Sequence, residues 1–321
     1  MRDTDELHWE VVENGLDYLS RAVAETAGRD EDLKYAVLHL YAAIETIVKA
    51  RLAREHWTLT VAKIEKAKRA SYLAGDFASA GAQDVLARLR DVVGVPIKAE
   101  HLQAVSGVGN LRNRAAHFAL GAEPTEAVRA ALGAGLHFLL WFLETQLRPG
   151  APERETEAID DLLDEVAGPL GEIDTLVRTR MAALQPDLTG TQPAVECARC
   201  RQVAMLLTDD GPRCRFCLHD PSGEDAADAY ASEVLGESAY RIVKQGGTWL
   251  VHDCLTCSAT ALVEGVDAPA HRQVHWACFA CGFHAGNDAL GRCSTCGQLM
   301  EHDTDGLDVC ADCLDYAVNR E

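Results

Sequence analysis

The chain has 321 residues, of which 48% are hydrophobic and 25% are charged, and its formal net charge is −20. This composition is typical of folded domains and excludes a largely disordered chain. The negative charge argues against indiscriminate binding to polyanions. The apolar runs are too short for a membrane span, and the first residues lack the pattern of a signal peptide. We therefore expect a cytoplasmic protein that does not bind membranes.

Charge and cysteine content divide the chain near residue 150. Residues 1–150 contain 18 basic and 20 acidic residues, whereas residues 151–321 contain 12 and 30. All 12 cysteines lie at or beyond Cys197. The segment 148–152 is rich in proline and glycine, which is typical of a boundary. The sequence therefore predicts two parts with different chemistry.

The first part is predicted to be an all-α bundle of about five helices. Apolar side chains recur at helical spacing over residues 5–26, 31–56, 81–93, 97–120 and 124–147. Connections of this length usually join antiparallel neighbours. In the fourth segment, Gly107-Val108-Gly109 suggests a break in the helix.

A candidate site lies in the fourth segment, where Arg112, Asn113 and His117 occur close together. Histidine exchanges a proton near neutral pH, and arginine holds a phosphate through two parallel hydrogen bonds. Together they suit metal-free RNA cleavage, with His117 as acid or base and Arg112 on the charged phosphorane. On a helix Asn113 and His117 share a face that Arg112 flanks. The spacing alone is more typical of solvated or structural residues, and two such pairs meeting across a dimer axis would make a better active site than one.

The Arg112-Asn113-x-x-x-His117 motif resembles the R-x₄-H motif of the HEPN superfamily (higher eukaryotes and prokaryotes nucleotide-binding). The preceding stretch from Glu45 to Leu52 resembles the E-x₃-K-A-R-L pattern that is common there. The resemblance covers roughly residues 5–147. It implies a helical domain that forms a homodimer, in which two motifs share a cleft. Many members are metal-independent endoribonucleases of toxin–antitoxin or antiviral defence systems.

The resemblance also implies roles for four residues. Arg112 would bind the scissile phosphate, His117 would be the acid or base, and Asn113 would fill the frequent polar position after the arginine. Glu45 would lie near the cleft. An ion pair between Glu45 and Lys49, four residues apart on one helix, is the alternative for Glu45.

Basic residues gather in and after the second predicted helix and again at the motif. They are Lys49, Arg51, Arg54, Lys63, Lys66, Lys68, Arg69 and Arg114. This concentration predicts a surface that binds the RNA backbone, on which Trp57 and Tyr72 would stack against bases. A solvated helix face would explain the same residues equally well.

Residues 151–190 are predicted to form an acidic helical connector. Apolar residues from Ile159 to Leu184 alternate in steps of four and three, with Arg180 in the one missing place, which is a heptad pattern. Gly168-Pro169 interrupts this pattern, so two helices are as compatible as one. The apolar seam would either extend a dimer or pack on its own bundle, and we favour packing slightly.

All 12 cysteines fall in C-x-x-C pairs, and pairing them in sequence gives three Cys₄ groups. The groups are Cys197, Cys200, Cys214 and Cys217; Cys254, Cys257, Cys278 and Cys281; and Cys293, Cys296, Cys310 and Cys313. Such thiolates bind structural Zn²⁺, so we predict three zinc ribbons, each with a short β-hairpin between its pairs. Gly282 and Gly297 follow their pairs at a place where the turn favours positive φ. Joining Cys278/Cys281 to Cys293/Cys296 is an alternative pairing.

The predicted chain is therefore multidomain. An all-α HEPN-like bundle (1–150) and a helical connector (151–190) precede three small β zinc ribbons (191–222, 223–288 and 289–321). The second ribbon also includes a predicted helix over residues 224–235 and a hairpin around residues 245–247.

These features predict a dimeric, metal-independent endoribonuclease whose ribbons recognise a partner or RNA. Bound zinc would make the second half still more negative, which favours a protein partner there, although four arginines surround the first ribbon. One alternative is a non-catalytic HEPN/zinc-ribbon interaction scaffold. Another is an acidic half that mimics nucleic acid and restrains the cleft.

Overall fold

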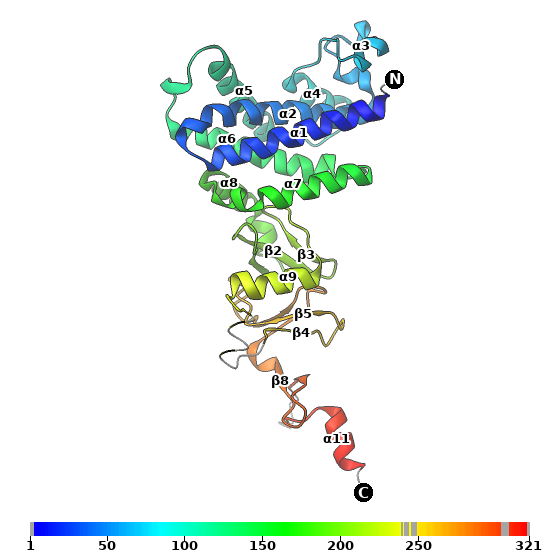
Figure 1. Ribbon diagram of the computed structural model, residues 1–321, viewed down its shortest axis with the longest axis vertical. Coiled ribbons are helices and arrows are strands. Elements are labelled where there is room, and N and C mark those ends of the chain that lie inside the picture. The colour runs from blue at the N-terminus through cyan, green and yellow to red at the C-terminus, as the bar shows by residue number, and fades with distance from the viewer. Residues whose placement is uncertain (1–2, 239, 241–243, 245–248, 303–307, 320–321) are drawn as a thin grey trace. The chain divides into compact units, whose positions relative to one another are not determined.

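The computed structural model describes residues 3–238, 240, 244, 249–302 and 308–319 (Figure 1). The chain forms two compact units, Met1–Ala182 and Ala183–Glu321. The first unit is helical, and the second contains small antiparallel sheets that carry the cysteine groups. The predicted succession of a helical part and small β modules is therefore confirmed. The boundary between the compact units falls inside the connector, 32 residues beyond the change in composition at residue 150.

The helical unit contains long helices at the predicted places. They are α1 (Thr4–Ala27), α2 (Leu33–Glu55), α4 (Ala82–Arg88), α5 (Ala99–His117) and α6 (Thr125–Phe142), with the short α3 (Arg69–Leu73) before α4. The carboxylate of Asp3 caps α1 by accepting hydrogen bonds from the amides of Asp5 and Glu6. Helices α4 and α6 continue as π-helical turns to Val93 and Leu147.

Helix α2 is the centre of the bundle, because α1, α4, α5 and α6 all pack against it. Its side chains Val37, Leu40, Ile44 and Ile47 are fully buried. The buried residues also include Ala50 on one side of this stripe and Val48 and Leu52 on the other, so they cover about half of the helix circumference, as expected for a helix that four others contact.

Helix α5 runs without a break through Gly107-Val108-Gly109, so the predicted interruption is absent. The reason is packing. A Cβ atom at Gly109 would lie 3.0 Å from the Tyr41 ring of α2, so glycine allows the two helices to approach closely.

Helix α6 and its continuation, Thr125–Leu147, form the one described helix that is long and apolar enough to cross a membrane. More than half of its most apolar window is buried inside the protein. Leu132, Leu136, Leu139 and Leu143 are fully buried. Its hydrophobicity is therefore that of a core helix.

The connector forms two helices, α7 (Glu153–Glu172) and α8 (Asp174–Leu188). The helix continues through Pro169, and the break falls at Ile173. Helix α7 packs on α1 and buries Ile159, Leu163, Val166 and Leu170 of the predicted seam. The alternative in which this seam packs on its own bundle is therefore the observed one.

The described residues of the second unit form three antiparallel sheets. The first sheet is β1 (Ala194–Glu196), β2 (Val203–Thr208) and β3 (Gly211–Cys214); the second is β4 (Val251–Asp253), β5 (Thr260–Glu264), β6 (Trp276–Cys278) and β7 (His284–Ala285); the third is β8 (Leu290–Arg292) and β9 (Leu299–Glu301). Helix α11 (Ala311–Val318) follows β9. The third sheet flanks the first cysteine pair of its ribbon, and the hairpin expected between Cys296 and Cys310 falls partly outside the described residues.

The first two ribbons are joined by the predicted helix, which is observed as α9 (Gly223–Ala229) with a π-helical turn to Val234. The Tyr230 ring packs against Phe279 at 5.2 Å between centroids. The Tyr230 hydroxyl accepts a hydrogen bond from the Asp267 amide. These contacts pack the helix against the second ribbon, and α9 also contacts β3 of the first ribbon. The hairpin predicted around residues 245–247 lies outside the described residues.

Candidate metal centres and candidate nucleic-acid site

The 12 cysteines form the three groups expected from sequential pairing. Within each group the four Sγ atoms lie within 4.8 Å of one another. Facing sulfurs of different pairs are 3.7 Å apart for Cys200 and Cys214 and 3.8 Å apart for Cys254 and Cys281. Four sulfurs at about 2.3 Å from one ion would form a tetrahedron with edges of about 3.8 Å. The three groups therefore fit tetrahedral metal sites, and the alternative pairing is wrong.

A left-handed residue follows the second cysteine in five of the six pairs. Gly282 and Gly297 have the predicted positive φ, and Arg201, Leu218 and Ser258 adopt it too. Sequence reasoning found the two glycines because only their residue type reports the conformation. The sixth pair differs, because Cys310 precedes α11 and Cys313 lies in its first turn.

Neighbouring groups shift the thiol pKa values in opposite directions. In the first group, hydrogen bonds from the other three cysteines hold the pKa of Cys197 well below its usual range, whereas burial raises that of Cys214. In the third group, backbone amides lower the pKa of Cys293 to about 6. Within a group, some cysteines therefore favour the thiolate and others keep their proton. A metal bound by all four sulfurs would displace the protons that remain on the thiols.

The arginines around the first ribbon are engaged by carboxylates. Arg201 pairs with Glu196 at 2.8 Å, and Arg215 pairs with Asp187 at 3.4 Å. Arg213 lies 4.0 Å from Asp220. The cationic character that the sequence indicates here is therefore partly neutralised within the ribbon.

Helix α5 carries all three residues of the predicted catalytic motif near its C-terminal end. The Arg112 guanidinium lies over the Tyr41 ring, 5.3 Å from its centroid, and donates a hydrogen bond of 3.1 Å to the Asn113 carboxamide. Tyr41 is inside the α2–α5 contact, and burial raises its pKa, with the charge of Glu45 acting in the same direction and Arg112 opposing it. Packing between the two helices thus positions the arginine.

His117 is exposed at the last position of α5. In the described part of the chain, no hydrogen bond or ion pair involves its imidazole. The next residue, Phe118, is 87% exposed, which is unusual for a large apolar side chain. The motif therefore lies on an open surface, next to the exposed Phe118. Each chain supplies one motif histidine, His117, to this surface.

Glu45 is bound by Lys49 at 2.6 Å, and Lys49 also donates a hydrogen bond to the Ser79 hydroxyl. This is the i,i+4 ion pair that sequence analysis kept as the alternative. The charges of Arg112 and Glu45 both influence the pKa of Tyr41, so Glu45 is near the motif arginine. His117 lies more than one helical turn further along α5.

The predicted RNA-binding residues divide into two sets. In the first set, carboxylates pair with the basic side chains: Lys49 with Glu45, Arg51 with Glu55, Arg54 with Glu155, and Arg114 with Glu123. The second set is exposed between α2 and α3 and consists of Lys63, Lys66, Lys68 and Arg69. We call this second set the basic loop.

The two aromatic residues predicted to stack on bases contact each other instead. The Trp57 and Tyr72 rings are 4.9 Å apart, and Tyr72 also packs on Phe77 at 5.2 Å. Tyr72 is buried, and burial raises its pKa. It anchors the segment between α2 and α4, whereas Trp57 stays half-exposed.

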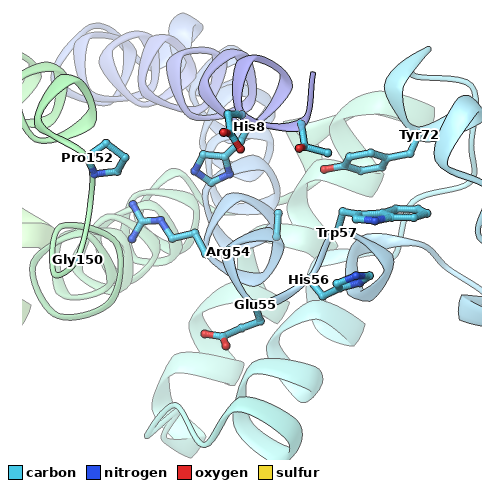
Figure 2. A pocket seen from close by; sticks show the side chains of 11 residues that line it. His8, Arg54, Glu55, His56, Trp57, Tyr72, Gly150 and Pro152 are labelled. Atoms are coloured by element: carbon cyan, nitrogen blue, oxygen red, sulfur yellow. The ribbon is translucent and has the colours of Figure 1, made fainter. Parts of the chain in front are cut away.

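Sequence reasoning missed a cavity of about 460 Å³ at this end of the bundle (Figure 2). It lies between the first turns of α1, the end of α2, and Gly150-Pro152. His8 binds Glu155 at 2.6 Å, and Arg54 binds the other oxygen of the same carboxylate. Burial works to raise the pKa of Glu155, but the His8 hydrogen bond and the Arg54 charge outweigh it and lower the pKa. Arg54 thus joins α2 to α7, and no local sequence pattern reveals a partner 101 residues away.

The motif and the basic loop are at different ends of α2. Arg112 contacts Tyr41 of α2, whereas Ala53 of α2 and Tyr72 of α3 line the cavity described above. Tyr41 and Ala53 are twelve residues apart, which is about 18 Å along the axis of α2. Figure 1 shows α3 close to the chain's N-terminus, in agreement with the cavity lining.

Comparisons of the chain with protein-family models, curated proteins and solved structures found no match.

Proposed function

We propose that the helical unit is a metal-independent endoribonuclease of the HEPN type that acts as a homodimer. The observation that carries the proposal is the arrangement on α5, where Arg112 is held over Tyr41 and bound to Asn113 while His117 stays open to solvent. Arginine and histidine at such a surface are suited to a phosphodiester and to proton transfer.

The chemistry explains why two chains are needed. In RNA cleavage the 2′-oxygen attacks phosphorus as a base removes its proton, and the 5′-oxygen leaves as an acid protonates it. One motif contains one histidine, so the second copy's His117 would perform the other proton transfer. Arg112 would stabilise the charge on the phosphorane. The products would end in a 2′,3′-cyclic phosphate and a 5′-hydroxyl.

The basic loop would supply backbone affinity for RNA. Its four side chains are exposed, whereas Lys49, Arg51, Arg54 and Arg114 are occupied by carboxylates. Phosphate contacts of this kind are independent of sequence and weaken with salt.

The three Cys₄ groups would hold structural Zn²⁺, which prefers a tetrahedron of thiolates. The cytoplasm, where thiols stay reduced, is the compartment in which such sites persist. The acidic ribbons would bind a protein partner, and a defence or toxin role follows from the HEPN resemblance.

The test is cleavage of total RNA in EDTA by purified protein whose metal content is measured before and after the reaction. We expect Arg112→Ala and His117→Ala each to lower the rate by about 10²–10⁴-fold. The matched controls are Arg90→Ala and His56→Ala, which remove an exposed arginine and an exposed histidine outside the motif.

The competing function is a non-catalytic scaffold in which the bundle and ribbons only recruit partners. Cleavage that yields cyclic phosphate ends and is lost in both motif variants favours the nuclease. If the unaltered chain cleaves nothing, or if all four variants cleave equally, the nuclease proposal fails.

A further inference from the structure

The three cysteine groups differ in their access to solvent. All four cysteines of the first group are buried. In the second group Cys257 is exposed, but the sulfur that faces it at 3.7 Å belongs to the buried Cys278. In the third group Cys293 is buried, Cys296 is exposed, and Cys310 and Cys313 are half-buried. The three sites have the same ligands, so exposure is what distinguishes their chemistry.

The ribbons also differ in what else holds them together. Around the first group, Val195, Leu207 and Phe216 are fully buried and form a small core. Within the described residues 289–302 and 308–319, Leu290 and Cys293 are the buried side chains. The third ribbon therefore has almost no apolar core, and metal ligation would provide most of its folding energy.

Charge separates the two sites further. Four arginines accompany the first group, although carboxylates pair with three of them. Near the third group lie Glu301, Asp308, Asp312 and Asp315, with Arg292 as a nearby cation. The two groups therefore differ in the charge around them, and exposure of its ligands is what opens the third group to an oxidant.

We propose that the third Cys₄ group is a thiol modification site, in which hydroperoxides oxidise Cys296 and Cys310 and release its metal while the first group keeps its own. This inference rests on the metal-binding part of the proposed function and is independent of the nuclease. Cys296 is the exposed ligand, and its Sγ lies 3.7 Å from that of Cys310.

The reaction takes two steps. The Cys296 thiolate attacks one oxygen of the hydroperoxide, the O–O bond breaks, hydroxide or alkoxide leaves, and a sulfenic acid forms. The Cys310 thiolate then attacks that sulfur, the S–S bond forms, and hydroxide leaves. Two electrons pass from the two thiolates to the peroxide. Cys293 and Cys313 would then be the two thiolates left to hold a metal, which is too few to retain it.

Release would also free α11. Cys310 is the residue before α11 and Cys313 lies in its first turn, so the metal fixes this helix to β8 and β9. Eight residues do not form a stable helix alone in water. Leu314, Tyr316 and Val318 are exposed on α11, so oxidation would dismantle the surface that they form.

The test uses the full chain after elemental analysis has shown three metal ions. Hydrogen peroxide is added stepwise, and released zinc is followed with a colorimetric chelator. We expect the ion of the third group to leave at least tenfold faster than the ion of the first group, together with a Cys296–Cys310 disulfide in peptide mass spectra. Hydrogen exchange should then show loss of protection in β8, β9 and α11 and continued protection in β1–β3.

Cys296→Ser/Cys310→Ser is the matched variant, and it should start with two ions and lack the fast phase. Release of all three ions at one rate, or of the ion of the first group first, would overturn the inference. Fewer than three ions at the start would instead refute the three-zinc assignment. Nuclease activity is not part of either readout.

Discussion

Arg54 shows how a single residue can change the interpretation of a charged segment. In the sequence it is one of seven basic residues between positions 49 and 69. In the structure its guanidinium is tied to Glu155 and to the Leu147 carbonyl, and its Nε atom is buried without a partner among the described residues. Composition could locate the basic segment. It could not identify which side chains have distant carboxylates as partners.

His137 provides a pH-dependent prediction. Burial, followed by the positive charge of Arg180 on α8, lowers the pKa of His137 to about 4. His101 and Lys98 also disfavour the charged form, while Glu100 favours it. The fold therefore prefers neutral His137, whereas the unfolded chain takes up a proton near pH 6.5. Stability should be complete above about pH 6.5 and should fall by roughly 2 kcal/mol as the pH approaches 4.

Thermal unfolding of the helical unit, followed by circular dichroism between pH 7 and 4.5, tests this prediction. His137→Leu removes the titrating group and should flatten the pH dependence. His56→Leu, which changes an exposed histidine, should retain the slope of the unaltered chain. Equal slopes in all three proteins would show that His137 does not control the transition.

Among the elements, α7 is the one whose role differs most from a simple connector. Its apolar side chains pack on α1, Ser20 donates a hydrogen bond to Glu165, and Glu155 binds both His8 and Arg54. The heptad pattern predicted which face is apolar. It could not decide what that face contacts, because a seam of this kind fits another chain or its own bundle equally well.

A fragment of residues 1–150 should therefore be much less stable than a fragment of residues 1–190. Removing α7 exposes the surface covered by Ile159, Leu162, Leu163 and Val166, at about 2 kcal/mol for each side chain. It also leaves Arg54 without Glu155. Chemical denaturation of the two fragments measures the difference. Equal midpoints would show that α7 contributes little to the stability of the bundle.

The helices and ribbons were predictable for different reasons. Helical periodicity located α1, α2 and α6 because their apolar faces are nearly continuous. Cysteine spacing predicted the three groups because two thiolates in a tight turn supply half of a tetrahedral metal site, and a second pair completes it. The uninterrupted α5 was not predictable, since the fit between Gly109 and Tyr41 depends on another helix. Similarly, the left-handed Arg201, Leu218 and Ser258 have no signature in residue type.

For the whole molecule, the proposed activity requires a dimer, and Phe118 should lie in its interface. Phe118→Asp should convert the chain to a monomer and reduce RNA cleavage in parallel, because it places a charge beside the motif. Val92→Asp is the matched control, since Val92 is 67% exposed at the end of α4. It should leave both properties unchanged.

Sedimentation velocity at micromolar concentration measures the association. A monomeric unaltered chain, or a Phe118→Asp chain that stays dimeric, would contradict this placement of the interface.

The net charge of the whole chain has different consequences for its two halves. Residues 151–321 account for most of the excess of acidic residues. Residues 1–150 carry a net charge of −2 and present the exposed basic loop, so the total of −20 does not describe the surface that RNA would meet. The order of segments could be predicted from the sequence. The compact boundary at Ala182 could not, because it depends on where α7 packs.

The separation between Arg112 and the basic loop has a consequence for substrate length. Tyr41, under the Arg112 guanidinium, and Ala53, near the end of α2 that precedes the basic loop, are about 18 Å apart along the helix axis. This length corresponds to five or six nucleotides of a stacked strand, at about 3.4 Å for each nucleotide. An oligonucleotide shorter than this would reach the motif without touching the loop. Its cleavage would depend little on ionic strength, whereas longer RNA would be cut more efficiently in dilute salt and would lose that advantage as salt rises. The spacing between the motif and the basic loop would thus set the shortest RNA that can contact both.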